Sequence, residues 1–231
     1  MEIARHHQTP ELQCSNSKLF ALENNGDNQL AHLDGLFDEI QLASGNPLFT
    51  RDENPEYLFL VKKGLIKLQQ LLIDGELRII RVVRRGEVVG LRGMLQEQPY
   101  RYDASAMVPT TVCRIRIEEL NRISTYNPWI RQKLYQRWQQ AIDQSSSWLV
   151  DLSTGSSKSR LAHLLIKLAA PGSNRVCHMP TRHEMASMLG LQSETVSRIY
   201  SEFSRAGYGS KLSSKRAALD LDALRGVIDR K

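Results

Sequence analysis

The chain has 231 residues, of which 41% are hydrophobic, which is enough apolar material for one large core or two smaller ones. Charged residues interrupt every apolar run well before the roughly 18 residues that a membrane span needs, so we expect no contact with a membrane. The N-terminal stretch MEIARHHQTPELQ lacks the apolar centre of a secretion signal, which predicts a cytoplasmic protein.

The positive charge lies in the C-terminal third of the chain. Residues 1–150 contain 18 lysines and arginines and 18 acidic residues, whereas residues 151–231 contain 13 and 7. The net charge of +6 therefore belongs to the second part, which predicts that this part meets a polyanion. A domain that is merely soluble and basic would have the same charge, so this observation alone leaves both interpretations open.

Residues 42–117 have the pattern of short strands. Runs such as YLFLVKKG and ELRIIRVVRRG are rich in leucine and β-branched residues, and Gly64, Gly75 and Gly86 punctuate them at a regular interval. Asp74-Gly75 is a strong hairpin signal, because glycine adopts positive φ without steric cost. Strands at this spacing predict an antiparallel sandwich or barrel rather than βαβ units.

A long helix is predicted to begin at Asn127-Pro128, because asparagine is a good N-cap and proline is tolerated at the first helical position. Along it, alternating gaps of four and three residues define a heptad seam of Leu134, Trp138, Ala141, Ser145, Trp148 and Leu152. Such a seam indicates two helices packed side by side, and we interpret the tryptophan pair as a dimer contact. A helix packed on its own barrel would give the same pattern.

The residues after this helix predict a hinge and a helix-turn-helix. The small polar stretch 153–157 breaks the long helix, an amphipathic helix follows over 159–170, and 176–179 reads as a short strand. Thr181 and Glu184 form a capping-box pattern that opens a helix ending at Gly190. A second helix starts within three residues, which is the spacing of a helix-turn-helix.

The second of these helices carries a polar edge. Glu194, Ser197 and Arg198 are spaced i, i+3 and i+4, so they share one helix face. The opposite face is apolar and would hold the helix against its partner through Val196, Ile199 and Phe203. An arginine can donate two hydrogen bonds to guanine and a glutamate can accept one from cytosine, so this pair could read a G·C base pair. An exposed salt bridge is the alternative, but the position on the second helix of a helix-turn-helix in a basic region favours DNA.

The order of barrel, long helix, hinge and helix-turn-helix over roughly residues 20–225 resembles the CRP/FNR family of bacterial transcription regulators. The stretch TRHEMASMLGLQSETVSRIYSEF looks like the signature of that family, and its ETVSR run is closer to the FNR branch than to the cyclic-AMP receptor branch. The resemblance implies an α+β fold with an N-terminal antiparallel β-roll (a cyclic-nucleotide-binding-like barrel), a long dimerisation helix and a C-terminal winged helix-turn-helix. The corresponding divisions are an N-terminal arm at 1–24, the β-roll sensor domain at 25–126, the dimerisation helix at 127–153 and the DNA-binding domain at 154–231.

The resemblance also implies how DNA would be bound. Glu194, Ser197 and Arg198 would read a TTGAT-like half-site, and a homodimer would bind an inverted repeat of it because the two-fold axes must match. Residues expected to hold DNA phosphates are Thr181, Arg182, His183, Gln192, Thr195 and, from a winged hairpin, Lys211. RNA polymerase is a further partner that the resemblance implies.

The expected effector pocket departs from the family pattern. Residues 86–106 resemble the family's phosphate-binding cassette, with Arg101 at the position for a cyclic phosphate and Ser145 and Ser146 where the base would be met. Leu91, however, stands at the position of the ribose-binding glutamate, and Tyr102 replaces a small hydroxyl residue. Leucine cannot accept the hydrogen bond of a ribose hydroxyl, so we do not expect cyclic AMP as the effector. Binding of a different ligand in the same cavity is an alternative that the sequence leaves open.

The three cysteines do not match a cofactor site. Cys14 and Cys113 resemble two of the four positions that an FNR-type iron–sulfur cluster needs, but Phe20 stands at a third, so we do not expect a cluster. A redox disulfide between Cys14 and Cys113 is an alternative to two inert buried thiols. Cys177 is expected to be a small core residue, with an oxidisable brake on DNA binding as the alternative.

Other functional classes find less support in the sequence. Metal-dependent enzymes on double-stranded barrels need clustered histidines, and residues 42–117 contain none, so we predict neither a metal site nor an enzyme. Haem attachment through CxxCH is absent from the sequence, as is a glycine-rich phosphate loop. The remaining alternative is a ligand-binding β-roll module whose basic C-terminal domain binds DNA only nonspecifically.

Overall fold

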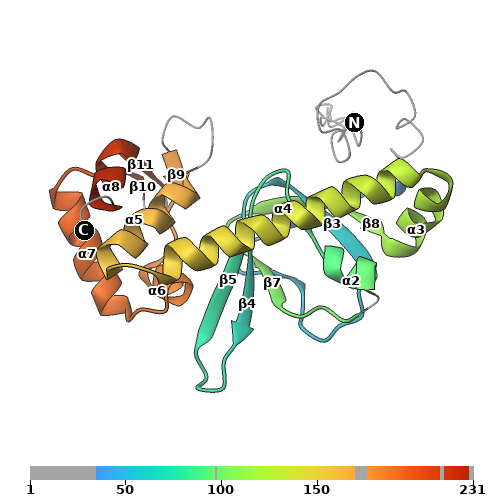
Figure 1. Ribbon diagram of the computed structural model, residues 1–231, viewed down its shortest axis with the longest axis horizontal. Coiled ribbons are helices and arrows are strands. Elements are labelled where there is room, and N and C mark those ends of the chain that lie inside the picture. The colour runs from blue at the N-terminus through green and yellow to red at the C-terminus, as the bar shows by residue number, and fades with distance from the viewer. Residues whose placement is uncertain (1–34, 97, 170–175, 214–215, 229–231) are drawn as a thin grey trace, which may run out of the picture.

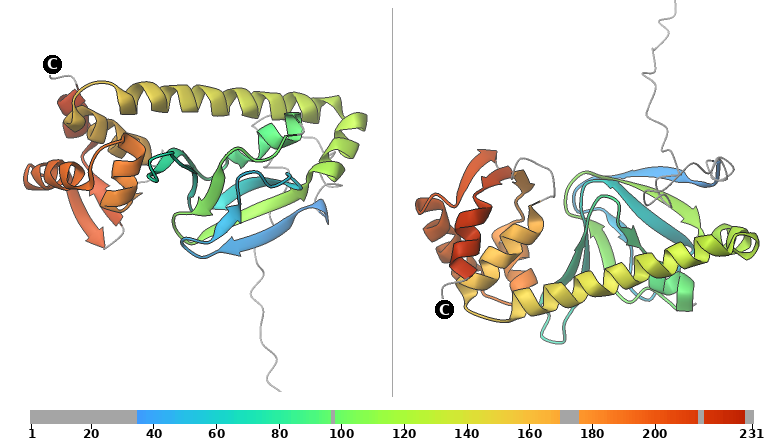
Figure 2. Two further views of the ribbon diagram at one scale, coloured as in Figure 1. Left: turned by 90° about the horizontal axis from the view of Figure 1, so that it is seen from below. Right: turned by 45° about the horizontal axis from the view of Figure 1, so that its top comes forward.

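A β-roll and a smaller helical domain make up the computed structural model, which describes residues 35–96, 98–169, 176–213 and 216–228. The long helix α4 (Pro128–Ser153) runs along one side of the roll and ends beside the helical domain (Figures 1 and 2). The predicted N-terminal arm, with Cys14, and the first ten residues of the predicted sensor domain lie outside the described residues. Among the described helices, none is long and apolar enough to cross a membrane.

The roll consists of two four-stranded antiparallel sheets. Their strand orders are β1-β8-β3-β6 and β2-β7-β4-β5. The strands are β1 (Asp38–Leu42), β2 (Pro47–Phe49), β3 (Tyr57–Lys63), β4 (Ile66–Leu71), β5 (Leu77–Val83), β6 (Val88–Val89), β7 (Asp103–Ala106) and β8 (Thr110–Arg116). The predicted antiparallel β-roll is therefore confirmed. Apart from the β4–β5 hairpin, consecutive strands lie in different sheets, which local spacing does not reveal.

Glycines make the sharp turns of the roll possible. Gly75 has φ +83° at the turn between β4 and β5, where Leu71 pairs with Leu77, so the predicted hairpin is confirmed. Gly64 has φ +94°, and a Cβ there would lie 2.7 Å from the Cα of Thr110. The chain can therefore pass so close to β8 only because this residue has no side chain.

Two apolar clusters stabilise the roll. Between the sheets, Val61, Ile66, Val83 and Val112 are each 0% exposed. A second cluster joins the sheet of β3 and β8 to the helices that follow it, α3 (Ile117–Tyr126) and α4, through Leu120, Ile130 and Leu134. A short helix, α2 (Leu91–Gln96), lies between β6 and β7. Neither α2 nor α3 was predicted.

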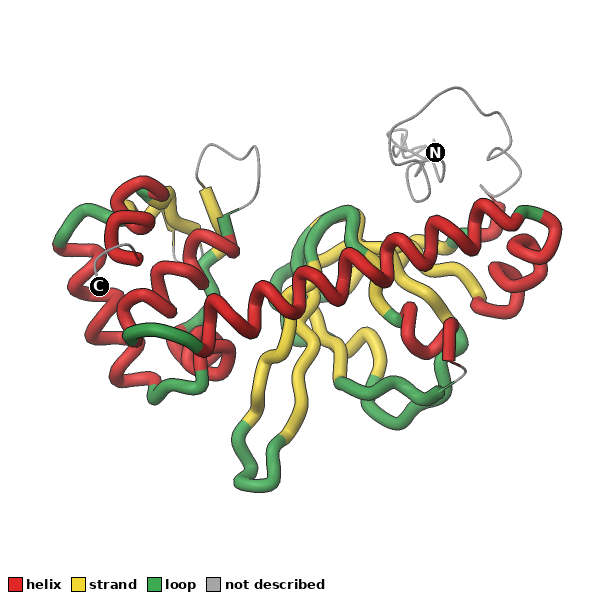
Figure 3. The backbone as a smooth tube through the Cα atoms, viewed as in Figure 1, coloured by secondary structure: helices red, strands yellow, loops and turns green. Residues whose placement is uncertain are grey.

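The C-terminal domain is a winged helix-turn-helix, as predicted. Its helices are α5 (Ser157–Leu168), α6 (Arg182–Leu189), α7 (Ser193–Arg205) and α8 (Leu221–Ile228). A three-stranded sheet of order β10-β11-β9 completes it, with β9 (Val176–His178), β10 (Gly209–Ser213) and β11 (Arg216–Leu219). The tube in Figure 3 shows these elements gathered at the end of α4, away from α3.

The heptad seam on α4 faces the chain itself, which corrects its interpretation as a dimer contact. Leu134 is 2% exposed in the core of the roll, whereas Trp148 and Leu152 are 8% and 5% exposed in the core of the C-terminal domain. Trp138 packs against the roll, and Ala141 and Ser145 line a cavity beside it. These six positions repeat with a helical period because α4 packs along its own chain, which was the alternative reading.

A different face of α4 is apolar and exposed. Tyr135, Ile142 and Leu149 are 50%, 41% and 70% exposed, and they are spaced by seven residues. They follow the predicted seam by one position, so they lie about 100° around the helix from it. A heptad stripe that the described residues leave exposed has the geometry of a helix–helix contact.

Candidate nucleic-acid interface

The helix-turn-helix is fixed by capping and by a shared apolar core. The hydroxyl of Thr181 accepts a hydrogen bond from the amide of Glu184 at 3.1 Å, and the Glu184 carboxylate accepts one from the Thr181 amide at 3.0 Å. Gly190, with φ +58°, ends α6 in the left-handed conformation that glycine tolerates best. The capping box and the glycine stop that the sequence predicted are both confirmed.

The outer face of α7 presents the predicted base-reading residues. Glu194 and Arg198 are exposed and Ser197 is half-buried, while the inward face is buried through Val196, Ile199 and Phe203 at 0%, 1% and 5% exposed. The structure therefore brings Glu194, Ser197 and Arg198 together on the solvent side of the helix. A short polar cluster at the N-terminal end of such a helix is what a major groove can admit.

Arg198 has an acidic neighbour on its own helix. Its Nη1 lies 3.4 Å from Oε1 of Glu202, and the other carboxylate oxygen of Glu202 lies 2.6 Å from Nζ of Lys158 on α5. The hydrogen bond from Lys158 is the largest cause that holds the pKa of Glu202 below its usual value. Sequence reasoning missed Glu202, although the i, i+4 spacing from Arg198 was a visible signal.

The residues expected at DNA phosphates occupy different environments. Thr181, His183 and Gln192 are exposed, Thr195 is half-buried, and Lys211 lies on β10 with a side chain outside the described atoms. Arg182 differs, because its guanidinium carbon lies 3.4 Å from the centre of the Tyr200 ring. This cation–π contact joins α6 to α7, so Arg182 has a structural role that the sequence did not indicate.

A cavity of about 330 Å³ lies between the roll and α4. Arg101, Ser145 and Ser146, the predicted effector-pocket residues, all line it, together with Leu91 and Tyr102. Leu91 is 5% exposed, so an apolar side chain occupies the position where the family resemblance places a ribose-binding acid. Most of the other lining residues are apolar, among them Leu68, Ile80, Val88, Val89, Trp138 and Ile142.

Tyr100 forms part of the cavity wall that sequence reasoning missed. Its ring stacks on Phe49 with 3.8 Å between the ring centres, and its hydroxyl donates a hydrogen bond to the Tyr57 carbonyl at 2.8 Å. Burial raises the pKa of Tyr100 to about 12, so it stays neutral at physiological pH. The wall is therefore rigid and neutral at this point.

The described cysteines are buried in apolar surroundings. Cys113 is 3% exposed in the core of the roll and Cys177 is 3% exposed on β9. Burial raises the pKa of the Cys177 thiol to about 11, which keeps it protonated and unreactive at neutral pH. Within the described part of the chain, no group of histidine, cysteine and acidic side chains could hold a metal ion.

A β-roll with a cavity at its helix and a winged helix-turn-helix beyond it are the architecture of a DNA-binding regulator. Residues 39–127 match the cyclic nucleotide-binding domain, and residues 159–227 match the Crp-like helix-turn-helix domain. The chain belongs to the CRP/FNR family of transcription regulators.

Relatives and solved structures agree with this assignment. The chain is 32% identical over 208 residues to the transcriptional regulatory protein btr of Bordetella pertussis, covering 87% of this chain and 86% of that protein. It is 31% identical over 172 residues to the transcriptional activator protein FnrA of Stutzerimonas stutzeri, covering 72% and 70%. The fold is similar to that of FixK2 from Bradyrhizobium japonicum, with a TM-score of 0.73 at 22% identity over 84% of this chain and 98% of that one.

Proposed function

We propose that the chain is a homodimeric regulator that reads a TTGAT-like inverted repeat through α7. The observation that carries this proposal is the outward position of Glu194, Ser197 and Arg198 on a helix whose other face is buried. Two relatives at 31% and 32% identity are named as transcription regulators, one of them as an activator, so activation through RNA polymerase is the mode we expect.

A homodimer would place two copies of α7 on successive turns of one face of the duplex. The contact that we propose for it is the exposed stripe of Tyr135, Ile142 and Leu149 on α4. Two such stripes related by a two-fold axis would bury each other without disturbing Leu134 or Trp148, which the chain already uses in its own cores.

The effector that we propose is not cyclic AMP. Leu91 would leave a ribose hydroxyl without an acceptor, and Tyr102 fills space where a small hydroxyl residue would join Arg101 at the phosphate. The aliphatic and aromatic walls of the cavity favour a less polar molecule.

The proposal is tested by a competitive gel shift. A duplex with the TTGAT–ATCAA inverted repeat should stay bound in the presence of excess scrambled competitor at moderate salt, because base contacts add to the phosphate contacts that any duplex offers. If the competitor displaces the inverted-repeat duplex as readily as it displaces a scrambled duplex, the alternative function is favoured. That alternative is a ligand-binding roll with a domain that binds DNA nonspecifically.

A further inference from the structure

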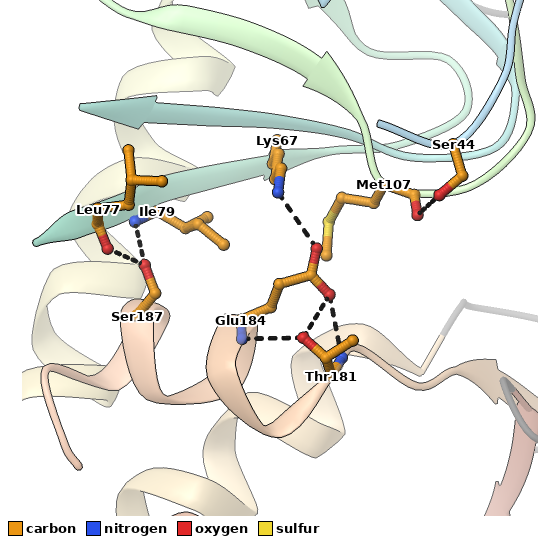
Figure 4. A network of polar contacts seen from close by, with 8 residues as sticks. All are labelled: Ser44, Lys67, Leu77, Ile79, Met107, Thr181, Glu184 and Ser187. Carbon is orange, nitrogen blue, oxygen red and sulfur yellow. Dashed lines mark hydrogen bonds and ion pairs between the residues drawn. The ribbon is translucent and has the colours of Figure 1, made fainter. Parts of the chain in front are cut away.

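The backbone of α7 is constrained by the elements behind it. Its neighbour α6 is bonded to the roll, because the hydroxyl of Ser187 accepts a hydrogen bond from the Ile79 amide at 3.0 Å and donates one to the Leu77 carbonyl (Figure 4). The inward faces of α6 and α7 are buried in one apolar cluster. The freedom that remains to Arg198 on the outer face is therefore mainly that of its own long side chain.

Three charged side chains form a row along the outer face of α7. Glu194, Arg198 and Glu202 are spaced by four residues, so each lies about one turn from the next. An arginine between two carboxylates can reach a phosphate only if a carboxylate also approaches that phosphate, which costs free energy because like charges repel. The edge of a base carries no net charge, so this row favours a base over a phosphate as the partner of Arg198.

Glu202 is bound on two sides. Its Oε1 lies 3.4 Å from Nη1 of Arg198, and its Oε2 lies 2.6 Å from Nζ of Lys158 on α5. On a helix, an i, i+4 ion pair with the cation first is the weaker of the two orders, and an isolated exposed pair contributes little. The contact with Lys158, which comes from a different helix, is therefore what restrains the carboxylate.

We propose that Glu202, anchored by Lys158, is a positioning residue that turns Arg198 toward a base and keeps it away from the phosphates. An arginine has five N–H donors, and the contact of Nη1 with Glu202 leaves others for guanine O6 and N7. The same carboxylate occupies Lys158, which could otherwise contact a phosphate. Glu202 thus raises the specificity of DNA binding and lowers its nonspecific part. This inference rests on the proposed function, because it concerns how the base-reading arginine is used.

Replacement of the carboxylate by an amide of the same shape tests this role. We compare the dissociation constant of the inverted-repeat duplex with that of a duplex whose G·C pairs are replaced, and in Glu202→Gln the ratio of the two should fall by roughly fivefold or more. Affinity for scrambled DNA should rise by roughly threefold, with a salt dependence steeper by about one phosphate contact, because Lys158 is released. An unchanged ratio, or weaker binding to every duplex alike, would overturn the role.

Asp222→Asn is the matched control, because it removes one negative charge from α8 of the same domain. It should leave the ratio of dissociation constants as it is in the unmodified protein. A ratio that fell equally in Asp222→Asn and in Glu202→Gln would show an effect of net charge alone, and the positioning role would be wrong.

The anchor on α5 is tested separately. Lys158→Gln keeps the Glu202 carboxylate but removes the cation that restrains it, so the same ratio should fall by roughly threefold or more. Affinity for scrambled DNA should not rise in this variant, because the domain loses a positive charge. A ratio equal to that of the unmodified protein would show that Glu202 acts without α5, and the anchored arrangement would be wrong.

A measurement without DNA separates this inference from the proposed function. In the free full-length protein, the NMR order parameter of the Arg198 Nε–H bond should drop in Glu202→Gln to that of a flexible group, below roughly 0.6. If Arg198 is as mobile in the unmodified protein as in the variant, the positioning role is wrong whatever happens with DNA. If Arg198 is ordered but the unmodified protein has no preference for the inverted repeat, the proposed function fails while the positioning of Arg198 by Glu202 stands.

Discussion

The outer face of α7 and the cavity beside α4, which we propose as the sites for DNA and for an effector, are built in different ways. On α7, Glu194 and Arg198 project into solvent from a helix whose position is fixed by buried neighbours. The cavity has a volume of about 330 Å³ and is lined mostly by apolar side chains from several strands and from α2 and α4. A surface of this kind discriminates by individual hydrogen bonds, whereas a cavity discriminates by shape and by which polar groups it leaves unpaired. Substitutions should therefore act locally on the first and through packing on the second.

The largest effects should come from the cores that support the two regions. Phe203 supports α7 and Phe59 supports the roll, and each is 5% exposed. Phe203→Ala should destabilise the DNA-binding domain by about 3–5 kcal/mol and abolish duplex binding, because it leaves a void behind the outer face of α7. Hydrogen exchange should report faster opening of α7 in this variant and faster opening of β3 in Phe59→Ala. If α7 were equally protected against hydrogen exchange in both variants, the division into two cores would be contradicted.

A charge on the exposed stripe of α4 should dissociate the homodimer that we propose. Leu149→Asp should raise the dissociation constant of the dimer by roughly 100-fold, about 3 kcal/mol, because a buried carboxylate without a partner is costly. Sedimentation equilibrium at micromolar concentration measures this, with Asp143→Asn as a control on another exposed part of the helix. A dimer of unchanged stability would remove Tyr135, Ile142 and Leu149 from the proposed contact.

Loss of a helix cap should have a moderate effect on the DNA-binding domain. Thr181→Ala removes the hydroxyl that accepts from the Glu184 amide and should cost about 1 kcal/mol of stability. Thr181→Ser keeps that acceptor and should be close to the unmodified protein in a denaturant titration. Equal destabilisation by alanine and serine would show that the methyl group of Thr181, and not its hydroxyl, contributes.

The smallest expected effect is that of cyclic AMP on the roll. A ligand that binds the folded state raises the melting temperature by an amount that grows with the ratio of its concentration to its dissociation constant, and the apolar Leu91 offers the ribose no acceptor. We therefore expect no change of melting temperature with millimolar cyclic AMP. A clear rise would contradict the interpretation of Leu91 and Tyr102.

The two regions also differ in how much of them could be predicted from sequence. The outer face of α7 belongs to a single helix, so the i, i+3 and i+4 spacing of Glu194, Ser197 and Arg198 was enough to place them together. The capping box at Thr181 and the hairpin at Gly75 were predictable for the same reason, because each is set by neighbouring residues.

The parts that could not be predicted depend on segments far apart in the chain. Tyr100 became visible as a cavity residue only once Phe49 and Tyr57 lay beside it. The heptad on α4 was interpreted as a dimer contact, although it packs on its own chain, because its period cannot tell a contact with the same chain from a contact with a second copy. The hydrogen bonds of Ser187 span more than 100 residues and have no local signal.

The most direct test of the proposal that the outer face of α7 reads bases compares the base preference of the protein with and without the guanidinium of Arg198. Binding to a set of half-sites, each with one base pair replaced, should show that Arg198→Ala loses about 1–3 kcal/mol of discrimination at the single G·C pair of the TTGAT half-site. Preferences at the other positions should persist, because the base contacts proposed for Arg198 are confined to this pair. A variant that binds more weakly but keeps the same preference at every position would assign Arg198 to a phosphate and contradict its role in reading bases.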